Sequence, residues 1–260
     1  MTHDEYVTLD GVNWSALKHI WNGSLLHYFH RGEDEDTSGR AMGREVHRLV
    51  LEPDSELDYV VWEGGDRRGK AWKEFEAAHP GRTIFKPAEV SACYRQAEAI
   101  VKHPVARELL KGCQFETPIQ WVDPVTRLKC KARLDAHRDI LIDLKGCSTT
   151  DPIMFGREAA KAGYHCQLAH YGNGLEGLNR QPPAATYIIA VETNFPHDVA
   201  VFRLPKSVIE VGAEEVAGCL YKLSKAIRSG KYPGRCEVEQ ELSVPNWVYG
   251  DDAISISGGN

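Results

Sequence analysis

The sequence lacks the features of a membrane or secreted protein. Its longest apolar runs are only a few residues long, as at residues 187–191, whereas a membrane-spanning helix needs about 20. Residues 1–5 have neither the basic nor the apolar block of a secretory signal. The seven cysteines are an odd number without a C-x-x-C pair, which argues against a disulfide framework, a zinc ribbon and a cysteine-bound iron–sulfur cluster. We expect a cytoplasmic protein with reduced thiols and no membrane partner.

Repeats, low-complexity segments and Pro/Gly/Ser-rich linkers are also missing. Of the 260 residues 42 % are apolar and 26 % are charged, which is typical of a folded globular chain. We therefore predict a single domain over residues 1–260, with a helical N-terminal part over about 1–110, a core over about 111–230 and a tail over 231–260. Neither a G-x-G-x-x-G nor a G-x-x-x-x-G-K-S/T loop is present, which disfavours an enzyme that holds a nucleotide cofactor.

Positive charge is not in excess. The formal net charge of −6 argues mildly against a nucleic-acid partner. The charges are uneven, however: acidic residues cluster at 33–36 and near Asp251, and basic residues at 67–70 and 129–133. An enzyme that cuts DNA needs carboxylates for a metal and only a local basic track for phosphates. The net charge is therefore uninformative, and we interpret the acidic segment 33–36 as a solvated loop.

The periodicity of the apolar residues predicts an α/β protein. Helices are predicted over residues 13–28, from Ser38 to a stop at Pro53, over 74–78 and onward from Pro87. Strands are predicted over 117–122, 128–134 and 140–145, helices over 153–161 and 164–174, strands over 186–191 and 199–204, and a last helix that ends at Gly230. This order favours a central mixed sheet flanked by helices, with a helical N-terminal part.

Two acids and a lysine carry the strongest chemical signal. Strand side chains alternate, so Asp143 and Lys145 point to one face of their predicted strand and Ile140, Ile142 and Leu144 to the other. Asp135 ends the neighbouring strand, so its carboxylate can converge with that of Asp143. Two carboxylates and a backbone carbonyl suit Mg²⁺ or Mn²⁺, and a lysine beside the metal can orient or deprotonate a water. Taken alone, D-x₇-D-x-K also fits a surface hairpin with a harmless Asp–Lys pair.

Two helices supply further candidates. Arg40, Arg44 and His47 share one helical face, where the arginines could hold phosphates and the histidine could bind a metal. Gln167 and Tyr171 also share a face and could touch a phosphate or a sugar. In isolation a lone histidine is more often ordinary surface or core, and ordinary helix surface explains Gln167 and Tyr171 equally well.

Together these residues match a family in order and spacing. The pattern Gly43-x-x-x-His47, Glu116, Asp135, Asp143-Leu144-Lys145 and Gln167-x-x-x-Tyr171 resembles the PD-(D/E)XK nucleases of the RecB and lambda-exonuclease type, most of all the RecE-type phage exonuclease domain. The likeness covers most of the chain, from the segment 15–17 through 43–53 and 164–167 to 242–247. It implies a restriction-endonuclease-like core. Asp143 stands where many relatives carry glutamate.

The resemblance implies roles for individual residues. His47, Asp135, Asp143 and the Leu144 carbonyl would bind two Mg²⁺ ions, for which Mn²⁺ would substitute, and Lys145 would position the attacking water. The side chains that would contact DNA are Gln167, Tyr171 and Thr149, besides Arg40 and Arg44. Glu116 matches an upstream acid of such nucleases, although a structural place at a strand end fits it equally. The arginine for a 5′ phosphate stays open among Arg31, Arg40, Arg67 and Arg68.

The resemblance also implies an activity. Such enzymes degrade linear double-stranded DNA processively from 5′ ends and leave 3′ single strands for an annealing protein. They form rings, here a homo-oligomeric trimer or tetramer, and a phage or prophage in a bacterial host cytoplasm is the implied source. Two alternatives remain: an endonuclease or nickase on the same core, and a catalytically idle DNA-binding or ring-forming module. The intact set Asp135, Asp143 and Lys145 argues against the idle module.

Overall fold

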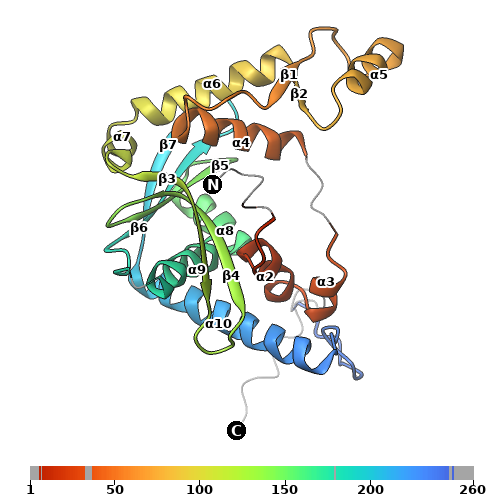
Figure 1. The fold of residues 1–260 in the computed structure, drawn as a ribbon, viewed down its shortest axis with the longest axis vertical. Coiled ribbons are helices and arrows are strands. Elements are labelled where there is room, and N and C mark those ends of the chain that lie inside the picture. Colours follow the sequence, from red (N-terminus) through yellow and green to blue (C-terminus); the bar gives the residue numbers. More distant parts are fainter. Residues whose placement is uncertain (1–5, 7, 33–36, 179, 246–247, 249–260) are drawn as a thin grey trace.

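The chain folds as a mixed sheet between two helical layers (Figure 1). The structure is a computed structural model that describes residues 6, 8–32, 37–178, 180–245 and 248. Its N-terminal part contains α2 (Trp14–Trp21), α3 (Leu25–Phe29), α4 (Ser38–Leu51), β1 (Tyr59–Val61), α5 (Gly69–Ala78), β2 (Thr83–Phe85), α6 (Pro87–Lys102) and α7 (Pro104–Leu110). There follow β3 (Gln114–Val122), β4 (Lys129–His137), β5 (Leu141–Cys147), α8 (Pro152–Ala162), α9 (Tyr164–Gly177), β6 (Thr186–Glu192), β7 (Val199–Leu204) and α10 (Lys206–Ser229).

The five strands of the main sheet lie in the order β3-β4-β5-β6-β7. Only β5 and β6 run parallel, because α8 and α9 form the crossover between them, and the other neighbours are antiparallel. The predicted mixed sheet flanked by helices is therefore confirmed. None of the described helices is both long enough and apolar enough to traverse a bilayer.

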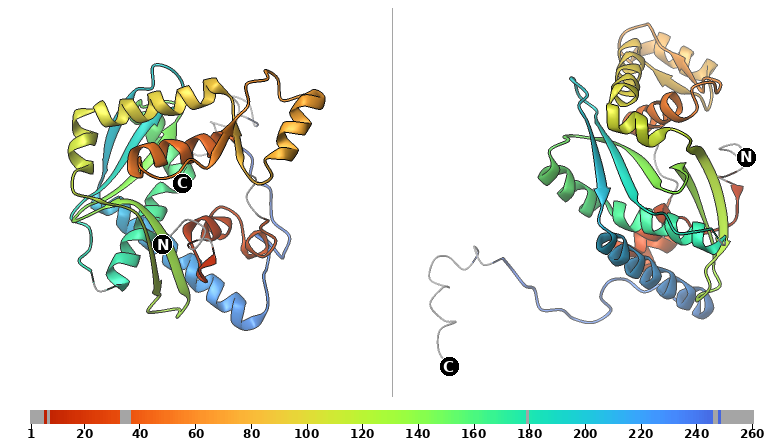
Figure 2. Two further views of the ribbon diagram at one scale, coloured as in Figure 1. Left: turned by 45° about the horizontal axis from the view of Figure 1, so that its top comes forward. Right: turned by 90° about the vertical axis from the view of Figure 1, so that its left-hand side faces the viewer.

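Each face of the sheet has its own apolar core. On one face α9 contacts β3, β4 and β5, and α10 packs on α9. On the other face α4 contacts β4 and β5, and α6 packs on α4 and β6 (Figure 2). Leu141 belongs to the core under α9, whereas its neighbours Ile142 and Leu144 belong to the core under α4. The alternation predicted for this strand is thus observed.

Strands β4 and β5 separate soon after the turn that joins them. They pair only at Ala136↔Ile142 and His137↔Leu141. Beyond these pairs the backbone N–H of Leu144 has no strand partner on β4, and the carboxylate of Asp135 accepts it instead (2.8 Å to Oδ2). The sheet is therefore open between the two acids of the sequence motif, and helices approach the opening from both faces.

The structure corrects several predicted boundaries. The predicted helix over residues 13–28 is two helices. The chain turns tightly at Gly23, where a Cβ would lie 2.4 Å from the carbonyl oxygen of His19, and Ser24 then caps a new helix. β1, β2 and α7 were not predicted, since three-residue strands and a seven-residue helix are too short for periodicity to show. β4 continues to His137, so Asp135 lies inside the strand rather than at its end. The acidic segment 33–36 lies outside the described residues.

Gly163 sets the start of α9, the helix that carries Gln167 and Tyr171. Its φ of +73° is left-handed, and a Cβ there would lie 2.8 Å from Cζ2 of Trp14. Gly163→Ala is therefore expected to lower the free energy of unfolding by about 2 kcal/mol, from the left-handed backbone and the close approach together. Urea unfolding measures this. Gly156→Ala on α8, where a Cβ meets open space, is the control and should leave stability equal or higher. Equal effects of the two substitutions would contradict this account of the turn.

His170 on α9 makes the stability of the fold depend on pH. It is completely buried against Trp121, and burial lowers its pKa from 6.5 to about 4. The unfolded chain therefore takes up this proton first, and stability falls as the pH drops below 6.5 until the folded pKa is passed. Between pH 7.5 and pH 5 the expected loss is about 2 kcal/mol. His170→Gln should remove this part of the loss in urea titrations at both pH values, and an unchanged pH dependence in the variant would rule the explanation out.

Candidate active site

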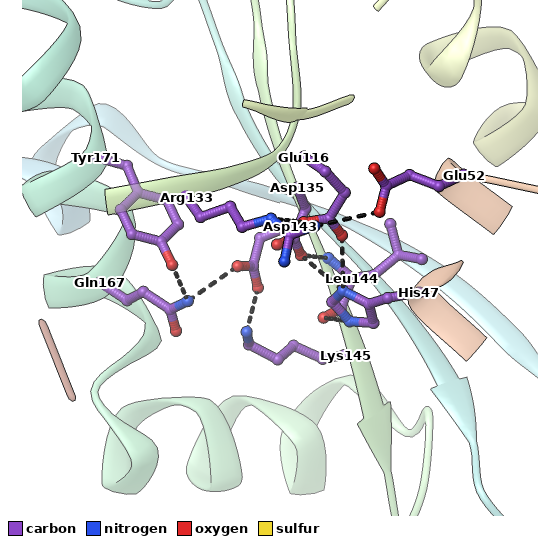
Figure 3. A network of polar contacts seen from close by, with 10 residues as sticks. All are labelled: His47, Glu52, Glu116, Arg133, Asp135, Asp143, Leu144, Lys145, Gln167 and Tyr171. Carbon is purple, nitrogen blue, oxygen red and sulfur yellow. Dashed lines mark hydrogen bonds and ion pairs between the residues drawn. The ribbon is translucent and has the colours of Figure 1, made fainter. Parts of the chain in front are cut away.

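The opening between β4 and β5 gathers polar side chains from five elements of the fold (Figure 3). Asp143 and Lys145 point from β5 toward α9, and Asp135 lies beside them on β4. Asp143 is 1 % exposed and Asp135 8 % exposed. Two buried carboxylates at the edge of an apolar core are unfavourable unless cations or donors compensate them. The contacts of each acid therefore define what the site can do.

His47 reaches the opening from α4, on the opposite face of the sheet from α9. Its Nε2 lies 3.1 Å from the carbonyl oxygen of Leu144. Its Nδ1 lies 3.6 Å from Oδ2 of Asp135 and 3.7 Å from Oε1 of Glu116. One imidazole thus lies against a carbonyl and two carboxylates, a set of donor atoms that are all available to a cation.

Glu116 occupies a strained position on β3. The register places it opposite Asp135, because Phe115 pairs with Ala136 and Thr117 with Leu134. Its φ is +45°, which costs a residue other than glycine about 1–3 kcal/mol and persists only where the surroundings enforce it. The side chain of Glu116 is held by Arg133, whose Nε lies 2.8 Å from Oε2 of Glu116. The other oxygen of this carboxylate, Oε1, lies 3.7 Å from Nδ1 of His47, so Glu116 lies beside the histidine while it also binds Arg133.

The other carboxylate, Asp143, has a separate set of partners. Its Oδ1 accepts a hydrogen bond from Nε2 of Gln167 (3.1 Å), and Gln167 also donates to the hydroxyl of Tyr171 (2.7 Å). Its Oδ2 lies 2.6 Å from Nζ of Lys145, yet it accepts no hydrogen bond of good geometry from the described residues and is buried. Lys145 in turn lies over the ring of Tyr164 (5.0 Å). Asp143 therefore has one oxygen that is held by an ion pair with Lys145 alone.

Burial and charge shift the protonation of the site. Burial raises the pKa of Asp143 to about 6, against the opposing effect of the Lys145 ammonium. Burial lowers the pKa of Lys145, but Asp143 and Asp135 outweigh it and the net shift is upward. Burial also lowers the pKa of His47, and there too Asp135 and Glu116 produce a net rise. Lys145 is consequently a cation at neutral pH, able to orient a water but not to take its proton.

The donor set fits a hard divalent cation. The donor atoms of His47, Glu116 and Asp135 lie within 4.8 Å of one another. The Leu144 carbonyl lies against the same imidazole, and the neighbouring strand residue Asp143 has a buried Oδ2 beside Lys145. Carboxylate and carbonyl oxygens with one imidazole suit Mg²⁺ and Mn²⁺. Binding would require His47 to lose its proton, since only the neutral ring coordinates a metal.

A cleft connects this site with α4 and α2. Arg40, Gly43 and Arg44 line it together with His47, Glu116, Arg133 and Lys145. The face of α4 that carries Arg40, Arg44 and His47 therefore lines the site, as the helical spacing predicts. Of the four arginines considered for a 5′ phosphate, only Arg40 lines this cleft. Arg67 instead binds Glu89 and the Ile84 carbonyl (2.7 Å each), Arg31 lies over Tyr28, and Arg68 precedes α5.

Thr149 is the one predicted site residue that the structure leaves apart from this network. Its hydroxyl accepts the N–H of Asp151 (3.2 Å), the residue that caps α8. Two residues that the sequence reasoning left without a role do belong to the site: Arg133, which holds Glu116, and Tyr164, which covers Lys145. Arg133 could have been found, since it precedes Asp135 by two positions on a strand and so shares its face.

A second cluster of polar side chains surrounds Glu215 and joins three helices. Its Oε2 accepts hydrogen bonds from Nε1 of Trp21 (2.7 Å) and from Sγ of Cys166 (2.9 Å), and lies 3.2 Å from Nε2 of His165. Burial raises the pKa of the Cys166 thiol, so it stays protonated and can donate. One carboxylate thereby ties α2, α9 and α10 together.

Comparison with known proteins places the chain in a family. The model of the "PDDEXK-like domain of unknown function (DUF3799)" matches residues 24–242. Among solved structures, a candidate exonuclease from Eubacterium rectale superposes with a TM-score of 0.63 at 13 % identity, covering 96 % of this chain and 98 % of that one. A phage-related exonuclease from Haemophilus somnus gives a TM-score of 0.37 at 13 % identity, with 87 % and 100 % covered. A search of the curated proteins gives no match.

The family match confirms the resemblance that the sequence motifs predict. The restriction-endonuclease-like fold follows from the same match, and the similarity to the Eubacterium rectale structure agrees with it.

Proposed function

The chain belongs to the family of PDDEXK-like domains, and on this basis we propose that it is a metal-dependent nuclease that hydrolyses DNA from its ends. The observation that carries the proposal is the convergence of Asp135, Asp143 and Lys145 with His47 in the opening between β4 and β5. Three of these side chains come from strands and one from a helix on the other face of the sheet. Burying these charged side chains costs free energy, and such clusters of titratable groups with shifted pKa values are typical of functional sites.

The residues divide the work of phosphodiester hydrolysis. Mg²⁺, held by His47, Asp135, Asp143 and the Leu144 carbonyl, would supply Lewis acidity to the phosphate and lower the pKa of a water. The Lys145 cation orients that water and offsets negative charge that develops on the phosphate. Glu116 would add a further carboxylate ligand, since its donor oxygen lies within 4.8 Å of those of His47 and Asp135. Mn²⁺ would substitute, since it prefers the same ligands.

The surrounding side chains position these groups. Gln167 donates to one oxygen of Asp143 and to the Tyr171 hydroxyl, and these two hydrogen bonds fix the orientation of the carboxylate. Arg133 does the same for Glu116. Arg40 and Arg44 line the cleft beside the acids, where guanidinium groups suit the phosphates of a bound strand. We assign Arg40 to the 5′ phosphate because the other candidate arginines lie outside the cleft.

The finer proposal is a 5′→3′ exonuclease on double-stranded DNA that leaves 3′ single strands for recombination. Its partners would be DNA ends and a single-strand annealing protein, and its assembly a homo-oligomeric ring in a bacterial cytoplasm with a phage or prophage as the source. This proposal follows the resemblance of the sequence motifs to RecE-type enzymes. An endonuclease or nickase would use the same site, and an idle DNA-binding module would not need it intact.

One digestion separates these activities. A linear duplex and a covalently closed circle of the same sequence are incubated with the protein and Mg²⁺, and the linear duplex carries a label at either the 5′ or the 3′ end. Early release of the 5′ label with the circle intact is expected. Cleavage of the circle would replace the exonuclease by an endonuclease or nickase, and early release of the 3′ label would reverse the polarity. If neither substrate is degraded with any divalent metal, the remaining explanation is the catalytically idle DNA-binding module.

A further inference from the structure

A cationic groove lies at the C-terminal end of α10, apart from the active-site cleft. Four of the residues that line it are basic: Lys222, Lys225, Arg228 and Lys231. Its other walls include Leu25 of α3 and Pro233. Among the described residues, no residue lines both this groove and the active-site cleft. A substitution in the groove therefore leaves the proposed catalytic residues unchanged.

The sequence concentrates positive charge at this groove. Residues 216–236 contain five lysines and arginines and no aspartate or glutamate, in a chain whose net charge is −6. The preceding half of α10 carries the acids Glu210, Glu214 and Glu215. Like charges three or four residues apart destabilise a helix by a few tenths of a kcal/mol. The helix dipole favours cations only within the last turn, so it accounts for Arg228 but not for Lys222 and Lys225.

Within the described part of the chain, the groove cations have no acidic partner. The ion pair that a lysine of α10 does form there is Lys206–Glu210, at the other end of the helix. Lys225 lies over the ring of Tyr221 at 5.7 Å, which restrains the ammonium without neutralising it. The positive potential of the groove is consequently open to a polyanion in solution.

The walls of the groove are held together before any ligand arrives. The N–H of Leu26 donates to the carbonyl of Pro233 (3.1 Å), and the rings of Phe29 and Tyr232 lie 4.6 Å apart. These contacts fasten α3 to the chain that follows α10. Figures 1 and 2 show the C-terminal end of α10 beside α3, with α2 next to them. Ser15 of α2 lines the active-site cleft and Leu25 of α3 lines the groove, and these two helices contact each other.

We propose that this groove binds the sugar–phosphate backbone of duplex DNA outside the active-site cleft, so that the protein holds its substrate at two places. The proposal rests on the proposed function for its choice of DNA among polyanions. Lys222, Lys225 and Arg228 are spaced by three residues and extend over about 9 Å of helix. A duplex carries one charge for about every 1.7 Å of its axis, so several phosphates fall within this length. Binding here retains the DNA without taking part in hydrolysis.

The salt dependence of binding tests the groove without requiring hydrolysis. A labelled duplex is titrated in EDTA with the wild type and with the triple variant Lys222→Gln, Lys225→Gln and Arg228→Gln, at several NaCl concentrations. The slope of log K against log[salt] is expected to fall by about 0.9 for each phosphate that the protein no longer neutralises, about 2.7 for three. The control triple variant Lys102→Gln, Lys111→Gln and Lys206→Gln removes the same charge from lysines already paired with glutamates. It should keep the wild-type slope.

Each other outcome overturns the proposal. A wild-type slope in the groove variant would remove the groove from DNA binding, and an equal reduction in both triple variants would mean that only net charge matters. A change confined to a single-stranded oligonucleotide would remove the assignment to duplex DNA, and weakened binding to polyglutamate with unchanged DNA binding would point to an acidic protein. Because the titration is done in EDTA, these results stand whether or not the protein cleaves DNA.

Discussion

Asp143→Asn is expected to lower the rate of DNA hydrolysis by on the order of 10²–10⁴-fold while leaving the fold in place. Asn matches the shape of Asp and can still accept a hydrogen bond from Gln167 at its oxygen. It cannot offer the second anionic oxygen, which lies buried beside Lys145 without a hydrogen-bond donor of good geometry among the described residues. Initial rates of nucleotide release at saturating DNA and Mg²⁺ measure the effect.

The control for this substitution lies on the same hairpin. Asp139→Asn removes a carboxylate that is 67 % exposed at the turn before β5, and it should retain the wild-type rate. A thermal scan with Mn²⁺ provides a second readout, since a ligand at 100 times its Kd stabilises a protein by about 2.7 kcal/mol. The Asp143 variant should lose most of this stabilisation. Full activity of Asp143→Asn would remove Asp143 from the mechanism.

Lys145→Met is expected to reduce kcat by a similar factor, on the order of 10²–10⁴-fold, with little change in KM. Methionine preserves the length and the packing against Tyr164 but has no charge to orient a water or to offset charge on the phosphate. Stabilisation by Mn²⁺ should persist, because Lys145 is not a ligand. This split between catalysis and metal binding distinguishes Lys145 from Asp143. The exposed Lys161→Met on α8 serves as the control.

A different split would change the role of Lys145. If Lys145→Met lost both activity and stabilisation by Mn²⁺, the ammonium would serve to hold Asp143 in place. If KM alone rose, Lys145 would act in DNA binding. Either result contradicts a lysine that acts on the attacking water.

Local periodicity was sufficient to predict the part of the site that lies on one strand. Alternation along β5 puts Asp143 and Lys145 on one face, and helical spacing along α9 puts Gln167 with Tyr171. The structure brings all four together. These relations depend on neighbours in the sequence, which is why residue spacing alone could predict them.

Residue spacing could not predict the contacts between residues that lie far apart in the sequence. His47 meets Leu144 across 97 positions, because α4 crosses the face of the sheet opposite α9. The separation of β4 from β5, which creates the opening, leaves no mark in either strand's pattern. Glu116 likewise has a left-handed backbone and binds Arg133 on the neighbouring strand, and neither feature follows from residue spacing. For His47 and Glu116, the resemblance to a nuclease family supplied what the periodicity could not.

The cationic groove shows what a net charge conceals. Acids elsewhere in the chain outweigh the cations of residues 216–236 and give a net charge of −6. The fold places four of these cations along one groove at the end of α10, where their charges add. The distribution of charge over the structure, more than its sum, bears on whether this protein can hold DNA.

The most direct test of the account is the release of acid-soluble nucleotides from a linear duplex by the wild-type protein in Mg²⁺, in EDTA, and in EDTA followed by excess Mg²⁺. We predict release in Mg²⁺, none in EDTA, and recovery when Mg²⁺ is restored. Equal release in EDTA, or no release with either Mg²⁺ or Mn²⁺, would contradict a metal-dependent nuclease at the opening between β4 and β5.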